Sequence, residues 1–276
     1  MNLKLKSALD FPIDRLAQIM NAGFEDYLVP IQLTSERMAR LLLMDGIDLQ
    51  LSQIAIQQDE PVGLSFIAQR GWTSRLAAMG IAREARGTGI GTRLMEHLVD
   101  AAKKRGNRTM VLEVIEQNEP AVKLYQKMGF TIKSRLIGFS GVDLEGISNP
   151  GLERMDVPDV MRLLHRYGPT DLPWQVAPET FANAGGVYQA YRLDKAVGLF
   201  ILFPEAEFAI IQSIVVPPEH QRQGHASNLI QAMIAAHPGR TWRAPIVFPE
   251  SLAPGFFENL GFKKESLSQY QMELKL

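Results

Sequence analysis

A glycine-rich segment in the first third of the chain has the composition of an anion-binding turn. Residues 79–91 read MGIAREARGTGIG, between residues that predict a strand and residues that predict a helix. The first N–H groups of a helix lack internal partners and carry positive potential, and glycine lets the backbone approach an anion. The segment therefore predicts a phosphate-binding turn, although a purely structural strand–helix turn would use the same residue types.

The glycine spacing separates three kinds of phosphate-binding turn. A Walker loop ends in Gly-Lys-Ser/Thr, whereas Gly91 is followed by Thr92 and Arg93. The dinucleotide-binding fingerprint needs G-x-G-x-x-G, whereas the glycines here alternate. The pattern that fits is Arg/Gln-x-x-Gly-x-Gly/Ala, with Arg86, Gly89 and Gly91 at the named positions.

A second segment places a tyrosine on a predicted helix. Residues 112–130 read LEVIEQNEPAVKLYQKMGF. Asn118 stands before Glu119-Pro120, where it is a good helix N-cap. Asn118, Ala121 and Tyr125 follow at i, i+3 and i+7, on one helical face. Tyr125 is either a packed aromatic residue or the source of a proton-donating hydroxyl.

Together the two segments resemble the GNAT superfamily of acyl-CoA-dependent N-acetyltransferases. The second segment is similar to the family's Asn-x-x-Ala-x-x-Leu-Tyr-x-x-x-Gly-Phe pattern at every named position. The resemblance implies a turn whose backbone N–H groups hold the pyrophosphate of coenzyme A, a strand that pairs with the pantetheine arm, and acetyl-CoA as co-substrate. The expected coenzyme-binding residues are Met79, Ile81, Arg86, Gly87, Thr88, Gly89, Ile90, Gly91 and Asn118.

The resemblance also implies two catalytic side chains. The tyrosine at the position of Tyr125 protonates the departing coenzyme thiolate in this family, and we expect that role here. An alkyl amine is mostly protonated at pH 7, so a base must take its proton. Glu113 lies twelve residues before Tyr125, a spacing similar to the base–acid pair of the ribosomal-protein alanine N-acetyltransferases. Glu113 is the expected base, or a residue that only fixes a loop, and Glu116 is a second choice. The N–H of Ile81 is expected to polarise the thioester carbonyl.

Both motifs recur later in the chain. Residues 221–226 match residues 86–91 at an offset of 135, and residues 257–262 match residues 125–130 at an offset of 132. Two matches in the same order indicate a duplication. The sequence therefore predicts two tandem domains.

The second copy departs from the pattern at its chemical positions. Glu250 stands where the first copy has Asn118, and Phe257 stands where it has Tyr125. Phenylalanine cannot protonate a thiolate. We expect this copy to be a degenerate half that shapes the acceptor groove, with non-catalytic binding of acyl-CoA as the alternative.

The elements that must position these residues alternate between strand and helix after residue 75, which predicts an α/β fold. In the first half we expect strands over 1–9, 51–57, 62–68, 75–82, 110–115 and 130–139, and helices over 13–24, from 34, over 92–105 and over 120–128. In the second half we expect helices near 157–167, 225–236 and 254–260, and strands near 187–192, 197–203, 208–216 and 242–248, with a closing strand.

The polar, turn-rich residues 141–151 predict a linker between a catalytic domain, 1–140, and a second domain, 152–276. The resemblance implies that each domain is a mixed, mostly antiparallel twisted sheet flanked by helices.

Composition narrows the classes of function. A formal net charge of −1 and the lack of a basic stripe argue against nucleic-acid binding. The sequence has no cysteine, which excludes disulfides, thiolate metal sites and a cysteine nucleophile. His165, His220 and His225 lack metal-ligand spacing. With no apolar run of about 18 residues and no signal-peptide core, we expect a soluble, cytoplasmic protein.

The predicted function is transfer of an acetyl group from acetyl-CoA to a primary amine by direct attack, in the N-terminal domain. The acceptor is expected to be a small-molecule or peptide amine. The resemblance places it along residues 24–30 (FEDYLVP), which offer acids and aromatic rings, although a solvated loop explains the acids at least as well. The alternative is a non-catalytic protein that binds or senses acyl-CoA, or serves as a scaffold. The oligomeric state does not follow from the sequence.

Overall fold

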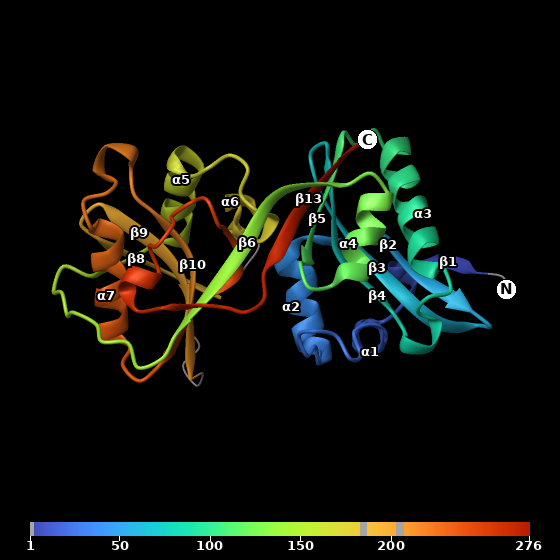
Figure 1. Cartoon of the computed structure of the whole chain (residues 1–276), viewed down its shortest axis with the longest axis horizontal. Helices are drawn as coiled ribbons and strands as arrows, with labels where there is room; N and C mark the ends of the chain where they lie inside the picture. Colours follow the sequence, from blue (N-terminus) through green and yellow to red (C-terminus); the bar gives the residue numbers. More distant parts are fainter. Residues whose placement is uncertain (1–2, 183–186, 203–206) are drawn as a thin grey trace. The chain divides into compact units, whose positions relative to one another are not determined.

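Two compact units make up the chain (Figure 1). The computed structural model describes residues 3–182, 187–202 and 207–276; residues 1, 2 and 203, at the ends of predicted strands, lie outside them. Unit 1 comprises residues 1–133 and 270–276, and unit 2 comprises residues 134–269. The last strand of the chain thus belongs to unit 1.

The units divide the chain differently from the predicted domains 1–140 and 152–276. The physical reason is that strand β6 (Thr131–Gly141) begins in unit 1 and continues in unit 2, while the C-terminal strand belongs to the first unit. The sequence predicts a linker over 141–151. Gly141 instead ends strand β6, whereas residues 142–151 contain neither helix nor strand, and the whole segment lies within unit 2.

Unit 1 is a mixed sheet with helices on both faces. Its strands are β1 (Lys4–Ser7), β2 (Ile47–Gln57), β3 (Glu60–Arg70), β4 (Thr73–Ile81), β5 (Thr109–Ile115), the start of β6, and β13 (Gln269–Lys275). Its helices are α1 (Ile13–Gly23), α2 (Ser35–Asp45), α3 (Ile90–Lys104) and α4 (Glu119–Lys127), with short 3-10 helices η1 (Ala8–Asp10) and η2 (Arg83–Ala85). The strand order is β1-β2-β3-β4-β5-β13. β4 and β5 are parallel, whereas the pairs from β1 to β4 are antiparallel.

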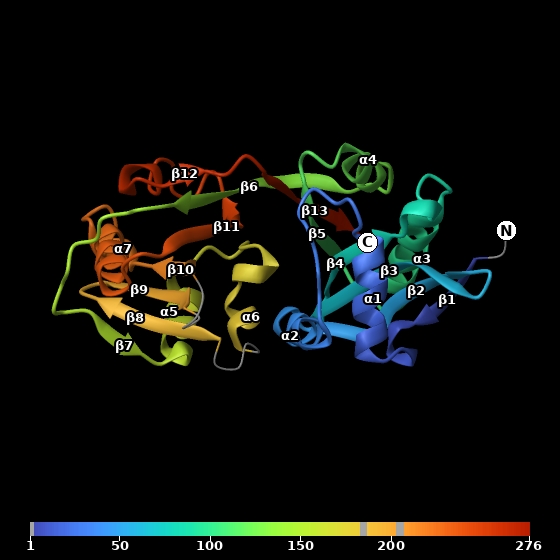
Figure 2. The ribbon, with the colours of Figure 1, turned by 90° about the horizontal axis from the view of Figure 1, so that it is seen from below.

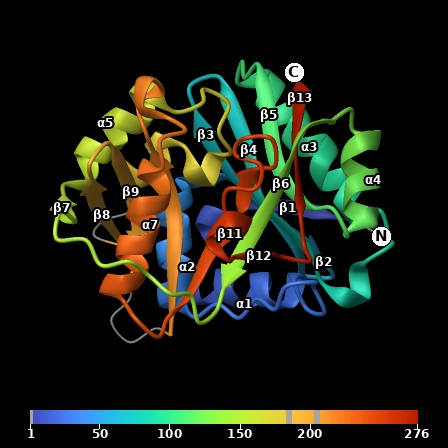
Figure 3. The same ribbon diagram turned by 60° about the vertical axis from the view of Figure 1, so that its left-hand side comes forward.

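Buried clusters of apolar side chains hold the helices of unit 1, whose ribbons are drawn in Figure 3, on the sheet. Helices α1 and α2 pack on β2 and β3 through residues such as Leu16 and Met38. Helices α3 and α4 pack on β4, β5 and β13 in a separate cluster. Met95, Leu98 and Ala102 of α3 are buried there, so the predicted apolar face of this helix is confirmed.

Unit 2 repeats this arrangement in shorter form. Its strands are the rest of β6, β7 (Glu153–Met155), β8 (Tyr188–Leu193), β9 (Ala196–Ile201), β10 (Phe208–Val215), β11 (Thr241–Pro249) and β12 (Lys263–Lys264). Its helices are α5 (Val157–Tyr167), α6 (Pro178–Ala182) and α7 (His225–Ala236), with 3-10 helices η3 (Trp174–Val176), η4 (Pro218–His220) and η5 (Glu258–Leu260). Figure 2 shows its strands side by side in the order β6-β11-β10-β9-β8-β7. Here the parallel pair is β10 with β11.

One predicted helix of unit 2 is wrong. Residues 254–260 form turns and the three-residue η5 instead of a helix. Pro254, as the first residue, would be tolerated at a helix start, but Gly255 has a φ of 74°, in the left-handed region, which interrupts the helix in its first turn. The predicted helices over 157–167 and 225–236 agree with α5 and α7.

Candidate functional site

The site in unit 1 begins where β4 and β5 part. Their parallel pairing runs from Thr73 opposite Thr109 to Leu76 opposite Leu112, and β4 then continues along β3 as far as Ile81. The next residue of β4, Ala77, is skipped in the pairing with β3 and forms a β-bulge. Bulges at such places redirect a strand. The edge of β4 that carries Met79 and Ile81, both predicted to bind coenzyme, therefore extends beyond its ladder with β5.

The glycine turn after β4 has an open helix N-terminus. Gly87 and Gly89 have φ values of 76° and 86°, and Gly89 is the N-cap of α3 with no side-chain hydrogen bond to that helix end. No heavy atom lies within 4 Å of a Cβ placed on either glycine, so backbone conformation rather than crowding calls for glycine. The first N–H groups of α3, from Ile90, are thus positioned to meet an anion.

Two side chains of the turn bond to its own backbone. Arg86 donates from Nε to the carbonyl of Ile81 over 3.0 Å, and Thr88 donates from Oγ1 to the carbonyl of Ala85 over 2.7 Å. Both residues are predicted to bind coenzyme. Their side chains fix the turn, and coenzyme binding by these residues stays a prediction.

Helix α4 brings two predicted residues together and adds a third. Asn118 accepts a hydrogen bond from the N–H of Ala121 over 3.4 Å, so the predicted N-cap is confirmed. The Asn118 amide also hydrogen-bonds with the hydroxyl of Tyr27, which comes from the loop after α1. Tyr125 is 6% exposed and meets Phe130 edge-on, with ring centroids 6.0 Å apart. Asn118, Tyr125 and Tyr27 therefore form one cluster.

Burial sets the protonation of the two tyrosines. Burial raises the pKa of the Tyr125 hydroxyl, and the neighbouring Tyr27 phenol raises it further. Burial also raises the pKa of Tyr27, although its hydrogen bond with Asn118 acts in the opposite direction. A tyrosine with the usual pKa of 10 is already protonated at neutral pH, and the raised pKa of Tyr125 keeps the proton on its hydroxyl, as a proton donor requires.

Glu113 lies in a buried ion pair where β4 and β5 part. Its carboxylate accepts from Arg75 Nε over 2.9 Å, and Arg75 also bonds to Asp45, at the end of α2, over 3.0 Å. The side chains of Arg75 and Glu113 are each only 3% exposed. Burial lowers the pKa of Arg75, but the charges of Glu113 and Asp45 outweigh this and raise it overall. The carboxylate of Glu113 is thus engaged in a buried ion pair with Arg75.

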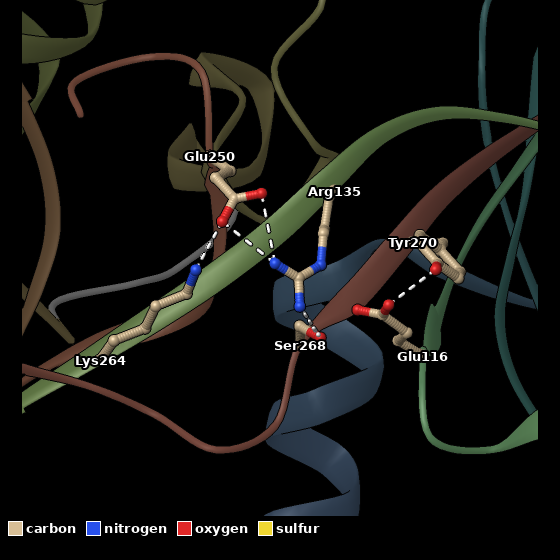
Figure 4. Close-up of polar contacts among 6 residues, drawn as sticks. All are labelled: Glu116, Arg135, Glu250, Lys264, Ser268 and Tyr270. Atoms are coloured by element: carbon tan, nitrogen blue, oxygen red, sulfur yellow. Dashed lines mark hydrogen bonds and ion pairs between the residues drawn. The ribbon is translucent and has the colours of Figure 1, made fainter.

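Glu116, the second choice for a base, is tied to the C-terminal strand. Its Oε1 accepts a hydrogen bond from the Tyr270 hydroxyl over 2.7 Å (Figure 4). The predicted domain boundaries place residue 270 in the second domain, so the contact between Glu116 and Tyr270 could not be predicted. Arg75 was also missed, although a charged residue in an otherwise apolar strand was a usable signal.

An open groove of about 960 Å³ lies along the segment predicted to bind the acceptor. It is lined by Asn21, Phe24, Glu25, Asp26, Tyr27, Pro30, Ile31, Gln32, Leu33, Thr34, Glu36, Arg37 and Arg40. Five of the seven residues over 24–30 are among them. Tyr27 joins this groove to Asn118, and so to the helix that carries Tyr125.

Unit 2 keeps the backbone of this site. β10 pairs with β11 from residue 208 opposite 241 to residue 210 opposite 243, the register of unit 1 at offsets of 135 and 132. Gln212, at the position of Ala77, is likewise skipped in a β-bulge. Gly224, the N-cap of α7, has a φ of 85°. Gln221 donates to the carbonyl of Val216 over 3.0 Å, as Arg86 does to that of Ile81.

The side chains of unit 2 differ from those of unit 1. Glu250 pairs with Arg135 over 3.0 Å and with Lys264 (Figure 4). Phe257 is buried and stacks on Phe139 with ring centroids 4.9 Å apart. Both residues line a small cavity of about 180 Å³. The position that corresponds to Tyr125 of unit 1 is thus part of an aromatic cluster in unit 2.

Two further features concern only the residues that the structure describes. Within 3–182, 187–202 and 207–276, no three His, Cys, Asp or Glu side chains gather in a way that could hold a metal ion. In the same ranges, no helix is both long and apolar enough to cross a bilayer.

Comparison with known proteins identifies both halves of the chain. Residues 19–130 match the "Acetyltransferase (GNAT) family", and residues 183–264 match an "Acetyltransferase (GNAT) domain". N-alpha-acetyltransferase 30 of Schizosaccharomyces pombe is 36% identical over 92 residues, which are 32% of this chain and 61% of that protein. The chain spans 61%, 45% and 37% of the lengths of three curated relatives that it matches.

Solved structures share the fold over the whole chain. A GCN5-related N-acetyltransferase from Sphaerobacter thermophilus has a TM-score of 0.73 at 13% identity, covering 99% of this chain and 95% of that one. A tandem GNAT protein from the clavulanic acid biosynthesis pathway has a TM-score of 0.68 at 14% identity, covering 99% and 98%. With both halves matched by family profiles, the chain belongs to the GNAT superfamily of N-acetyltransferases, as a tandem member with two such domains.

Proposed function

We propose that unit 1 transfers an acetyl group from acetyl-CoA to a primary amine by direct attack of the amine on the thioester. Proteins of this family use acyl-CoA donors in general, and acetyl-CoA is the donor proposed here. The observation that carries the proposal is the cluster of Tyr125, Asn118 and Tyr27, which joins the coenzyme side of unit 1 to the open groove.

The residues of unit 1 suit the coenzyme. The open N-terminus of α3, with positive φ at Gly87 and Gly89, suits a pyrophosphate. The edge of β4 beyond Leu76 suits an extended arm, and the N–H of Ile81 would polarise the carbonyl. When bound, the thioester supplies an activated acetyl group. Tyr125 holds the proton that the leaving thiolate requires.

The amine must lose a proton during the reaction. Because the Glu113 carboxylate is buried and paired with Arg75, we propose that Glu113 mainly holds the ends of β4 and β5 in place. Water in the open groove then carries the amine proton away. The prediction that Glu113 is itself the general base is the competing assignment, and the pH–rate profile of its glutamine variant separates the two.

The acceptor is proposed to be a primary amine that approaches along residues 24–30. Glu25 lines the groove there and would attract a cationic amine before it is deprotonated, whereas the charge of Asp26 is balanced by Arg83. The name of the yeast relative, an N-alpha-acetyltransferase, favours a peptide with a free α-amino group.

The direct test is release of free thiol from acetyl-CoA. Purified protein is assayed with synthetic peptides that have free amino termini and with small primary amines, while calorimetry measures coenzyme A binding. We expect binding together with amine-dependent thiol release. Coenzyme A binding without thiol release in the presence of any of these amines would favour the non-catalytic alternative. Unit 2 is consistent with that alternative, because Phe257 and Glu250 replace the tyrosine and asparagine of unit 1. An absence of binding would overturn both.

A further inference from the structure

Residues 23–27, here called the groove segment, are held against the coenzyme side of unit 1 along their whole length. Gly23 packs on β4 so closely that a Cβ added to it would lie 3.1 Å from the Cα of Gly80. Asp26 forms an ion pair with Arg83 of η2 over 3.0 Å. At the far end, Tyr27 hydrogen-bonds with Asn118 of α4. Because four of its five residues also line the open groove, the position of this segment sets the shape of the groove wall.

Arg86 bridges the glycine turn and the groove segment. Its Nε donates to the carbonyl of Ile81 over 3.0 Å, within the turn. A terminal nitrogen of the same guanidinium donates to the carbonyl of Glu25 over 2.6 Å and to that of Gly23 over 3.4 Å. A guanidinium is a rigid, planar group with five donors, so one side chain can hold two pieces of backbone at a fixed separation.

Unit 2 shows which of these bonds the turn itself requires. Gln221 occupies the position of Arg86, and its amide donates to the carbonyl of Val216 over 3.0 Å. Val216 precedes Gln221 by five residues, as Ile81 precedes Arg86. The two turns have nearly the same geometry, since the φ values of their glycine N-caps are almost equal. A single glutamine amide is therefore enough to form the hydrogen bond that closes such a turn. The additional donors of Arg86 serve the groove segment.

We infer that Arg86 is a positioning residue for the amine acceptor, separately from its place in the coenzyme turn. By holding the carbonyls of Gly23 and Glu25, it fixes the groove segment and so the placement of Tyr27 beside Tyr125. The kinetic part of this inference rests on the proposed function of unit 1. The structural part, that the groove segment is held by this guanidinium, does not.

Arg86→Gln separates the bond within the turn from the bonds to the groove segment. Unit 2 shows that a glutamine at this position can form the bond that closes the turn. Hydrogen–deuterium exchange of the amides of residues 24–27 is expected to rise about fivefold, the effect of losing roughly one net hydrogen bond. Exchange over residues 87–91 and calorimetric affinity for coenzyme A should stay within about twofold. The KM for a synthetic peptide with a free amino terminus should rise about fivefold, while the KM for acetyl-CoA changes little.

Arg86→Met removes the hydrogen bond to Ile81 and the hydrogen bonds to the groove segment. It should therefore disturb the turn and the groove segment together. Lys104→Gln, which removes one exposed positive charge at the other end of α3, is the matched charge control and should leave every reading unchanged. Unchanged exchange over residues 24–27 in Arg86→Gln would overturn the inference. An equal loss of affinity for coenzyme A and for the peptide would do so as well. If the wild-type protein releases no thiol, the proposed function fails, whereas the exchange measurement still decides whether Arg86 holds the groove segment.

Discussion

The coenzyme turns of the two units have the same backbone, but the helices that should complete the sites do not. Gly89 and Gly224 have φ values within about one degree of each other, and the parallel pairs β4–β5 and β10–β11 share one register. In unit 1 the following motif forms α4, with Asn118 as its N-cap. In unit 2 the same stretch contains Pro254 and Gly255 and forms only turns and η5.

This difference separates two parts of the chemistry. Binding of a pyrophosphate by backbone N–H groups depends on φ angles and on an open helix end, which both units possess. Protonation of a thiolate depends on one hydroxyl, which Tyr125 has and Phe257 lacks. The two units thus retain a common scaffold, and only unit 1 retains the side chain proposed for catalysis.

Replacing the proposed acid should have the largest effect. Tyr125→Phe gives unit 1 the side chain that unit 2 already has, and kcat for thiol release is expected to fall about 10³-fold. Calorimetric affinity for acetyl-CoA should change less than about threefold, since the turn is untouched. Tyr191→Phe, which removes a phenol hydroxyl from unit 2, is the matched control. An unchanged kcat in Tyr125→Phe would remove this residue from the mechanism.

The buried ion pair of unit 1 offers the next contrast. Residues Ile210 and Pro245 of unit 2 stand at the positions of Arg75 and Glu113, so the second copy has no charge there. Glu113→Gln should lower the free energy of unfolding by about 3 kcal/mol, because a buried guanidinium loses one of its two carboxylates. Urea unfolding measures this loss. Arg75→Met combined with Glu113→Leu should recover most of the stability.

The same glutamine variant decides how Glu113 acts. If Glu113 only holds β4 and β5 in place, kcat/KM should fall by a similar factor at every pH. If it is the general base, the acidic limb of the profile should disappear, because the group that titrates there has been removed.

Matched glycine substitutions compare the two turns directly. An alanine at Gly89 or Gly224 must adopt a left-handed φ, at a cost of about 1–2 kcal/mol. Gly89→Ala should weaken calorimetric binding of coenzyme A about tenfold, as this strain distorts the turn. Gly224→Ala should leave turnover by unit 1 intact. A second coenzyme A per chain that disappears in Gly224→Ala would show that unit 2 still binds the coenzyme.

Local signals were enough to predict the motifs and most of the elements around them. Glycine spacing predicted the turn, and the i, i+3, i+7 pattern predicted the face of α4 that carries Asn118 and Tyr125. These features depend on residues close in sequence, whose conformational preferences act before any tertiary contact forms.

Features that join distant residues could not be predicted in this way. The pairing of Arg75 with Glu113 depends on the strand register, and the bond between Tyr270 and Glu116 depends on where the last strand joins the sheet. No local pattern states that residues 270–276 belong to the first unit. The wrongly predicted helix over 254–260 is a different case, because Gly255, which interrupts it, is a local signal in the sequence.

The smallest expected effect concerns the acid that replaces Asn118 in unit 2. Hydrogen bonding from Lys264, and then from Arg135, holds the pKa of Glu250 below its usual value of 4.5. A carboxyl group whose folded pKa is depressed adds stability above its unfolded pKa, and this contribution is lost as the pH falls through the folded value.

Urea unfolding of wild-type protein should therefore show a loss of stability below about pH 4.5 that Glu250→Gln partly removes. The difference should stay below about 1 kcal/mol and shrink in high salt, because both Glu250 and Arg135 are partly exposed to solvent. Glu258→Gln, at a nearby exposed glutamate, is the control for loss of charge alone. A profile that is the same for wild type and Glu250→Gln would mean that this ion cluster fills the place of Asn118 without stabilising unit 2. The divergence of the second site would then be a loss of function with no gain in stability.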